Sequence, residues 1–164
     1  MRWGSMTEQR DKNERKLQRH FTLSMPLHTK NMLLIQPIPT KKEQQELCLR
    51  CGVTFDPDML AYRAVDDGVF VGICQFIIRD DKGILRDLKN AKDSNDRDAL
   101  FIMGRQTLNF IDLCGIHQAE YRGLEPDDAL LRRIGFHLSE DGSVWRMDLT
   151  GFFDGGTCKH SHTD

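Results

Sequence analysis

The sequence predicts a mixed α/β domain of the α+β kind, in which helices flank a mixed, mostly antiparallel central sheet. Short apolar segments separated by glycine-containing turns fill residues 62–88, which is typical of an antiparallel meander. Two longer amphipathic stretches, each ending near a glycine, lie on either side of that meander and predict helices. A length of 164 residues with 39% hydrophobic and 29% charged residues fits one soluble domain with a single core.

Composition excludes several classes of function. A formal net charge of −2 gives no broad basic field, so we expect no nucleic-acid partner. No apolar run approaches the roughly 20 residues that span a bilayer, so we expect no membrane partner and a cytoplasmic location. An odd number of scattered cysteines predicts free thiols rather than a disulfide framework. The five are Cys48, Cys51, Cys74, Cys114 and Cys158.

We expect three regions along the chain. Residues 1–30 form a polar N-terminal appendage, in which Thr7–His20 could form an exposed helix without an apolar stripe. Residues 31–154 form the single domain, and residues 155–164 form a C-terminal tail. Several methionines in the first 32 residues are plausible start sites, and the sequence leaves that choice open.

The domain is expected to begin with a strand and a helix. The apolar run Met32–Ile35 predicts a strand that ends at Pro37. Thr40 followed three residues later by Glu43 is a capping-box pattern, and Gly52 is suited to end the same helix in the left-handed conformation.

Three strands follow as a meander. They are predicted at Tyr62–Val65, Val69–Ile78 and Ile84–Leu88. The turns between them are Asp66–Gly68 and Asp80–Gly83, where we expect the glycines to supply the positive φ of tight hairpin turns.

A long helix is predicted from Arg97 to Cys114, closed by Gly115. Its apolar residues recur near one face, as expected of a helix that packs on a core. They are Leu100, Met103, Leu108, Ile111 and Cys114.

The last third predicts a strand, a short helix and a hairpin. The strand is Gln118–Tyr121. The helix opens at Pro126–Asp128 and ends before Gly135, with arginines in its last turn that complement the helix dipole. Phe136–Leu138 and Val144–Leu149 then predict the closing hairpin.

This order of elements, from Met32 to Leu149, resembles the GNAT superfamily of N-acetyltransferases. The most specific segment is Asp128-Ala-Leu-Leu-Arg-Arg-Ile-Gly-Phe-His, which is similar to the family's late helix and the Gly-Phe turn after it. The resemblance implies a sheet whose strands diverge near Leu88 and Gln118. It also implies acetyl-CoA or another acyl-CoA as donor and a small-molecule or peptide amine as acceptor. A homodimer is a further possibility, with Phe152 and Phe153 as a docking point or simply the core's edge.

The loop that binds coenzyme A phosphates in this family has the pattern Gln/Arg-x-x-Gly-x-Gly/Ala, because glycines let backbone amides approach the phosphates. The matching window here, Asn95–Leu100, contains no glycine, so this member's acyl-CoA loop is divergent. Asp96 and Asp98 would repel a phosphate, whereas Arg97, Lys89 and Lys92 would offset that repulsion. The cofactor-binding candidates that the resemblance implies are Leu88, Lys89, Arg97 and Ala99.

Catalytic candidates follow from the same resemblance. Many members place a tyrosine acid where this chain has Leu131, which cannot donate a proton. The acid would then be His117, Tyr121 or water, although His117 could instead satisfy carbonyls at a helix end and Tyr121 could be a sheet residue. Asp87, with Arg86 beside it, is the candidate general base, and the alternative is a surface carboxylate on an alternating strand.

The pair Cys48 and Cys51 also has the spacing of half a zinc site, which the tail's Cys158, His160 and His162 could complete. The alternative, which we favour, is that both thiols face a core as small apolar groups, so no metal is assigned. The leading function is therefore an acyltransferase, which rests on the resemblance to the GNAT fold, and the alternative is a non-catalytic GNAT-fold module that binds a ligand or partner. The absent glycines and the absent tyrosine are the observations that favour the alternative.

Overall fold

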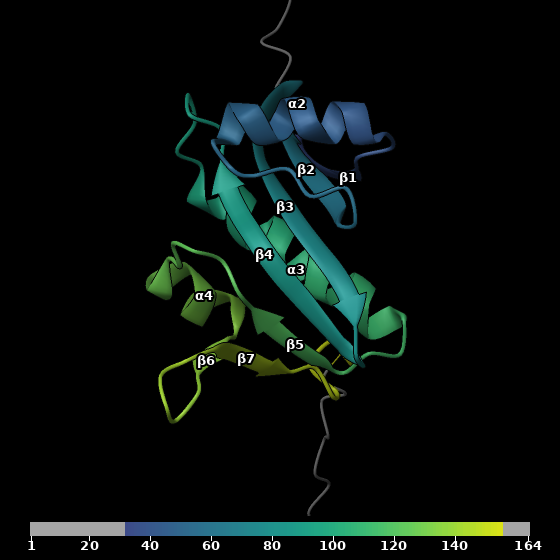
Figure 1. Ribbon diagram of the computed structural model, residues 1–164, viewed down its shortest axis with the longest axis vertical. Helices are drawn as coiled ribbons and strands as arrows, with labels where there is room; N and C mark the ends of the chain where they lie inside the picture. The colour runs from purple at the N-terminus through teal and green to yellow at the C-terminus, as the bar shows by residue number, and fades with distance from the viewer. Residues whose placement is uncertain (1–31, 156–164) are drawn as a thin grey trace, which may run out of the picture. The chain divides into compact units, whose positions relative to one another are not determined.

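A computed structural model describes residues 32–155, which form a seven-stranded sheet in the order β1-β2-β3-β4-β5-β7-β6 (Figure 1). All neighbouring strands are antiparallel except β4 and β5, which are parallel. The strands are β1 (Leu33–Pro37), β2 (Leu60–Asp66), β3 (Val69–Arg79), β4 (Lys82–Asn90), β5 (Gln118–Tyr121), β6 (His137–Leu138) and β7 (Trp145–Asp148). The predicted mixed, mostly antiparallel fold class is confirmed.

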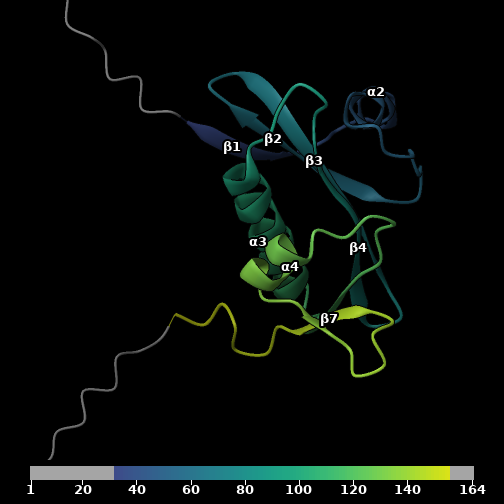
Figure 2. The same ribbon diagram turned by 90° about the vertical axis from the view of Figure 1, so that its left-hand side faces the viewer.

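Three helices occur among the described residues: α2 (Lys41–Cys51), α3 (Arg97–Leu113) and α4 (Asp128–Ile134). Each begins at a side-chain cap. Thr40 accepts a hydrogen bond from the amide of Glu43, as the capping pattern predicts, and Asp96 and Asp127 do the same for α3 and α4. Figure 2 shows α2 on one side of the sheet and α3 with α4 on the other.

The two sides of the sheet bury separate apolar clusters. The larger one lies under α3 and α4, where Met103, Leu108 and Ile134 meet Leu85 and Leu88 of β4. The smaller one lies under α2 and contains Leu47, Cys48, Cys51, Ala61, Phe70, Ile73 and Ala91. Cys114 does not join the buried face of α3, contrary to the prediction, because the helix ends at Leu113 and Cys114 is exposed.

The β3–β4 turn differs from its prediction. Asp80 and Asp81, not Gly83, adopt positive φ angles of 53° and 57°. Aspartate tolerates the left-handed region better than most residues, so the pair forms the turn by itself. Gly83 instead lies within β4, where a Cβ would stand 2.5 Å from the side chain of Ile111. Its lack of a side chain lets α3 approach the sheet closely.

Several predictions fall outside the described residues, namely the Thr7–His20 helix and the tail's Cys158, His160 and His162. Among helices of the described residues, none is both long and apolar enough to cross a membrane.

Candidate functional site

The sheet opens where β4 and β5 separate. The two strands pair only from Gly83 to Leu85, and the amide of Arg122 then donates a last hydrogen bond of 2.8 Å to the carbonyl of Leu85. Beyond that point β4 continues along β3 to Asn90, while the chain after β5 turns away toward α4 (Figure 1). The expected divergence near Leu88 is present, but Gln118 lies at the paired end of β5 and not at the opening.

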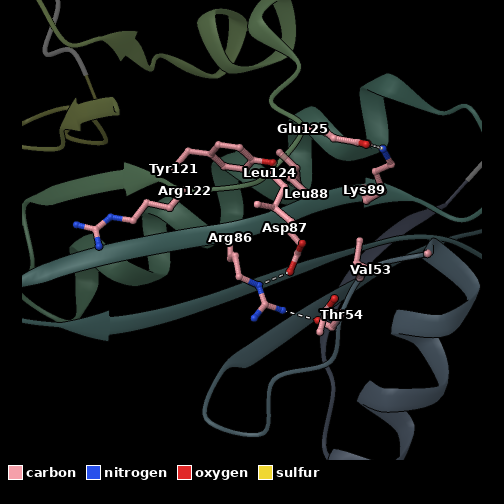
Figure 3. Close-up of a pocket in the computed structure, with 11 residues that line it drawn as sticks. Val53, Thr54, Arg86, Asp87, Leu88, Lys89, Tyr121, Arg122, Leu124 and Glu125 are labelled. Carbon is pink, nitrogen blue, oxygen red and sulfur yellow. Dashed lines mark hydrogen bonds and ion pairs between the residues drawn. The ribbon is translucent and has the colours of Figure 1, made fainter. Parts of the chain in front are cut away.

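A cavity of about 350 Å³ occupies this opening. Figure 3 shows Asp87 of β4 and Tyr121 of β5 among the side chains that line it. The loop after α2 forms the opposite wall through Val53 and Thr54, and the segment before α4 contributes Leu124. The candidate base and one candidate acid therefore lie at a single cavity, on the two strands that separate.

A bulge in β4 determines the direction of the Asp87 side chain. Gln75 pairs with Asp87 and Phe76 pairs with Leu85, so Arg86 has no partner on β3. Strict alternation would place Asp87 on the same face as the buried Leu85. The extra residue turns Asp87 to the face of α2 and returns Leu88 to the α3 core, which is the re-aiming that bulges provide.

Asp87 is held by two neighbouring side chains. Its Oδ2 accepts hydrogen bonds of 2.7 Å from Nε2 of Gln75 and 2.8 Å from Nε of Arg86. Arg86 also pairs with Asp56 at 3.1 Å and donates to the carbonyl of Thr54, so it fastens the loop after α2 to the sheet. The sequence does not single out Gln75 as a site residue. The one signal for it is that a glutamine lies within the apolar run of β3.

Tyr121 lies between the core and the cavity. Its side chain is mostly buried and its ring packs edge-on against Phe136, with centroids 6.5 Å apart. Burial, aided by the nearby Cys74 and Asp87, raises the pKa of Tyr121 well above its ordinary value. The phenol therefore keeps its proton at neutral pH, which is the form a proton donor needs.

The other candidate acid, His117, lies elsewhere, and so does Leu131, which occupies the position of the family's tyrosine acid. His117 is exposed just before β5, where its Nδ1 lies 2.7 Å from Oδ1 of Asp112, and it does not line the cavity. Leu131 points into the core beneath α4 and is fully buried.

A second cavity, of about 370 Å³, lies at the N-terminus of α3 and shares Leu88 and Lys89 with the first. Lys92 and Arg97 also line it. Two of these cations are paired across the cavity. Lys89 contacts Glu125 at 3.2 Å and Arg97 contacts Asp127 at 2.8 Å.

The glycine-free segment Asn95–Leu100, where α3 begins, does not offer the backbone amide of Ala99 to a phosphate. Ala99 is buried in the core and lines neither cavity. Its backbone amide donates a 2.8 Å hydrogen bond to Asp96, so this amide is already satisfied by the helix cap. Of the cofactor-binding candidates, the structure brings Leu88, Lys89 and Arg97 to the opening and leaves Ala99 outside it.

The two cysteines of α2 lie in the smaller apolar cluster. Cys48 and Cys51 are almost fully buried there, as predicted for small apolar residues that face a core. Between residues 32 and 155 there is no group of three or more histidine, cysteine, aspartate or glutamate side chains placed to hold a metal ion.

These buried thiols predict a loss of stability at alkaline pH. Burial raises the pKa of Cys48 to about 11 and that of Cys51 and Cys74 to about 12. Thiols of the unfolded chain ionise near pH 8.5, so above about pH 9 the unfolded state holds fewer protons than the native state and the free energy of unfolding falls. The urea midpoint, measured under reducing conditions, should decrease between about pH 9 and 11.

Replacing one buried thiol should reduce this pH dependence. In Cys51→Ala we expect a smaller decrease of the midpoint than in the unchanged chain, whereas Cys114→Ala, which removes an exposed thiol, should keep the full decrease. Equal pH dependence in the two variants would contradict the prediction. The comparison uses the change of the urea midpoint with pH rather than the midpoint at one pH, because the cavity in Cys51→Ala lowers stability at every pH.

Comparison with known proteins relates the fold to acetyltransferases. No family model matches the sequence, and no curated protein matches it. Solved structures do match. An IAA acetyltransferase from Bacillus cereus is 18% identical over 72% of this chain and all of its own, with a TM-score of 0.57. A GNAT family N-acetyltransferase from Escherichia coli in complex with CoA is 15% identical over 76% of this chain and 86% of its own, with a TM-score of 0.59.

The ribosomal-protein-S18-alanine N-acetyltransferase from Escherichia coli is a third match, 11% identical over 71% of this chain and 90% of its own, with a TM-score of 0.52. Residues 32–155 therefore have the GNAT fold, as the order of elements predicted. At these identities the likeness establishes the fold and leaves the reaction to be argued from the site.

Proposed function

We propose that this protein transfers an acyl group from an acyl-CoA thioester, bound in the opening between β4 and β5, to a primary amine. The supporting observation is the unpaired edge of β4 beyond Leu85, which borders a cavity lined by Asp87 and Tyr121. A strand edge offers backbone N–H and C=O groups to an extended ligand that contains amides. The acyl-CoA pantetheine arm is such a ligand.

The residues at the opening fit the two ends of an acyl-CoA to different degrees. Leu88 and the strand edge suit the pantetheine arm, and Lys89, Lys92 and Arg97 supply positive charge for the phosphates. The bound thioester would supply an activated carbonyl carbon at the cavity that Asp87 lines. Phosphate binding would have to displace Glu125 and Asp127 from Lys89 and Arg97, so we expect modest affinity.

In the proposed reaction the amine nitrogen forms a bond to the thioester carbonyl carbon, and the carbon–sulfur bond breaks. Asp87 accepts the proton that the attacking nitrogen loses, and Oδ1 is available because both described hydrogen bonds reach Oδ2. Tyr121 donates its phenolic proton to the departing sulfur, and solvent returns that proton. The products are an amide and a free thiol.

An assay of thiol release tests this proposal. Purified protein is incubated with acetyl-CoA and three amines: a peptide with a free N-terminal alanine, a peptide with an internal lysine, and a polyamine. We expect thiol release that depends on one of these amines and is matched by acetylated product in mass spectrometry. Thiol release at the uncatalysed rate with every amine and with longer acyl-CoA donors would reject the proposal.

A second candidate function is a GNAT-fold binding module without catalysis. The observation that favours it is that the groups expected to bind phosphate already have partners within the protein. Glu125 pairs with Lys89 and Asp127 pairs with Arg97. Asp96 caps the Ala99 amide. This module would bind a neutral or amine-bearing ligand at Asp87 without acyl-CoA. Saturable binding of one of the three amines, with no heat from millimolar acetyl-CoA in calorimetry, would favour it.

A further inference from the structure

Two glutamines that the sequence analysis did not select are buried beside the candidate base. Gln44 of α2 and Gln75 of β3 are 1% and 0% exposed. Burying an amide is unfavourable unless each polar atom finds a hydrogen-bond partner, and an apolar side chain of similar volume would avoid that cost. Both amides belong to one connected chain of hydrogen bonds, which apolar side chains could not form.

The chain runs from the start of α2 to the cavity. Nζ of Lys41 donates to Oε1 of Gln44 at 3.2 Å, and Nε2 of Gln44 donates to Oε1 of Gln75 at 2.9 Å. Nε2 of Gln75 then donates to Oδ2 of Asp87 at 2.7 Å. Every link donates in the same direction, from an ammonium at one end to a carboxylate at the other, so the links polarise one another.

The amide of Gln75 has only one satisfactory orientation. Its second Nε2 hydrogen bonds the carbonyl of Thr54 at 2.9 Å, so the nitrogen faces two acceptors while Oε1 faces the donor of Gln44. Rotating the amide by half a turn would place its oxygen against the Asp87 carboxylate and the Thr54 carbonyl. Gln44 is likewise fixed, because its nitrogen also donates to the carbonyl of Met59 at 3.3 Å.

We propose that Gln75, oriented by Gln44, is a positioning residue that holds Oδ2 of Asp87 and so directs Oδ1 to the incoming amine. This inference rests on the proposed role of Asp87 as the base. The bulge in β4 turns Asp87 toward this pair, and Arg86 donates a second hydrogen bond to the same oxygen. Removing the Gln75 donor leaves Oδ2 held by Arg86 alone, so the carboxylate has more freedom to rotate, and a small displacement of a reacting group lowers the rate steeply.

The test compares Gln75→Met with the unchanged chain, because methionine has a similar length and no strong donor. With acetyl-CoA and the fastest amine of the panel, we expect kcat to fall about tenfold or more while the KM for acetyl-CoA stays within about twofold.

A double-mutant cycle distinguishes positioning from general damage. In an Asp87→Asn background, Gln75→Met should not lower the residual rate further, because its effect acts through the carboxylate. A similar loss in both backgrounds, or an unchanged kcat in Gln75→Met alone, would overturn the proposal. Gln44→Met should give a smaller effect in the same direction, and it serves as the test if Gln75→Met does not fold.

An NMR measurement separates this inference from the proposed function. In uniformly ¹⁵N-labelled protein without ligand, the Gln75 side-chain amide resonances should exchange slowly with solvent and should shift when Asp87 is replaced by asparagine. If the shift occurs without any acyl transfer, the proposed reaction fails while the hydrogen-bond link stands. Rapidly exchanging resonances that ignore the Asp87 substitution would reject the link itself.

Discussion

Replacing Asp87 by asparagine is expected to lower the rate of amine acylation by about 10²- to 10⁴-fold, the range typical of a lost general base. Asparagine keeps the size of the side chain and its oxygen can still accept from Gln75 and Arg86. It cannot take a proton at neutral pH. Affinity for acetyl-CoA should change little, because the cations at the phosphate end are untouched.

The pH dependence and a matched control sharpen this prediction. The deficit of Asp87→Asn should narrow at alkaline pH, where more of the amine is already deprotonated. Asp56→Asn is the control, because Asp56 also pairs with Arg86 but does not line the cavity. A loss in Asp56→Asn as large as that in Asp87→Asn would mean that the arginine, rather than a base, limits the reaction.

Replacing Gly123 by alanine is expected to damage both the opening and the stability of the fold. A Cβ at this position would stand 2.6 Å from the carbonyl oxygen of Arg86 and would overlap the phenol of Tyr121. Either β4 and the segment after β5 move apart or the tyrosine ring leaves its place. Overpacking of this kind costs about 1–3 kcal/mol, and loss of the positioned phenol should lower kcat as well.

Urea unfolding and the thiol-release assay measure these two effects. Gly155→Ala provides the control, because a Cβ at Gly155 meets nothing within 4 Å. We expect the control to match the unchanged chain in both assays. If Gly123→Ala also matched it, the close approach between Gly123, Tyr121 and β4 would not be a feature of the folded protein in solution.

Much of the fold could be predicted because its signals are local. The cap at Thr40, the left-handed Gly52 after α2 and the Asp67-Gly68 turn each depend on one or two residues whose backbone preferences are strong. The apolar period of its residues predicts the helix α3. The error at Cys114 arose because periodicity continues one residue beyond the point where the helix ends.

The site was less predictable because its geometry depends on pairing between strands. Nothing in the amino-acid sequence of β4 indicates that Arg86 is the extra residue of a β-bulge. That bulge nevertheless decides whether Asp87 faces the core or the α2 side. The prediction for the β3–β4 turn was wrong for a related reason. Two aspartates supply the positive φ angles, which places Gly83 within β4 and sets the pairing of β4 with β3 as far as Leu85.

Long-range contacts account for the remaining differences. Gln44 and Gln75 are 31 residues apart, so their link to Asp87 is visible only once α2 packs on the sheet. His117 and Tyr121 are both near β5 in sequence, yet only Tyr121 lies at the end where the strands separate. Chain proximity alone could not choose between them.

The central claim is that the unpaired edge of β4 receives an acyl-CoA, and hydrogen–deuterium exchange tests it most directly. Exchange is followed by mass spectrometry on peptides covering the chain, with and without millimolar CoA. Hydrogen bonds to a ligand at the edge should slow exchange in the segment 86–90 and leave β1 and β2 unchanged. Unchanged exchange at 86–90, or protection confined to other segments, would contradict the account.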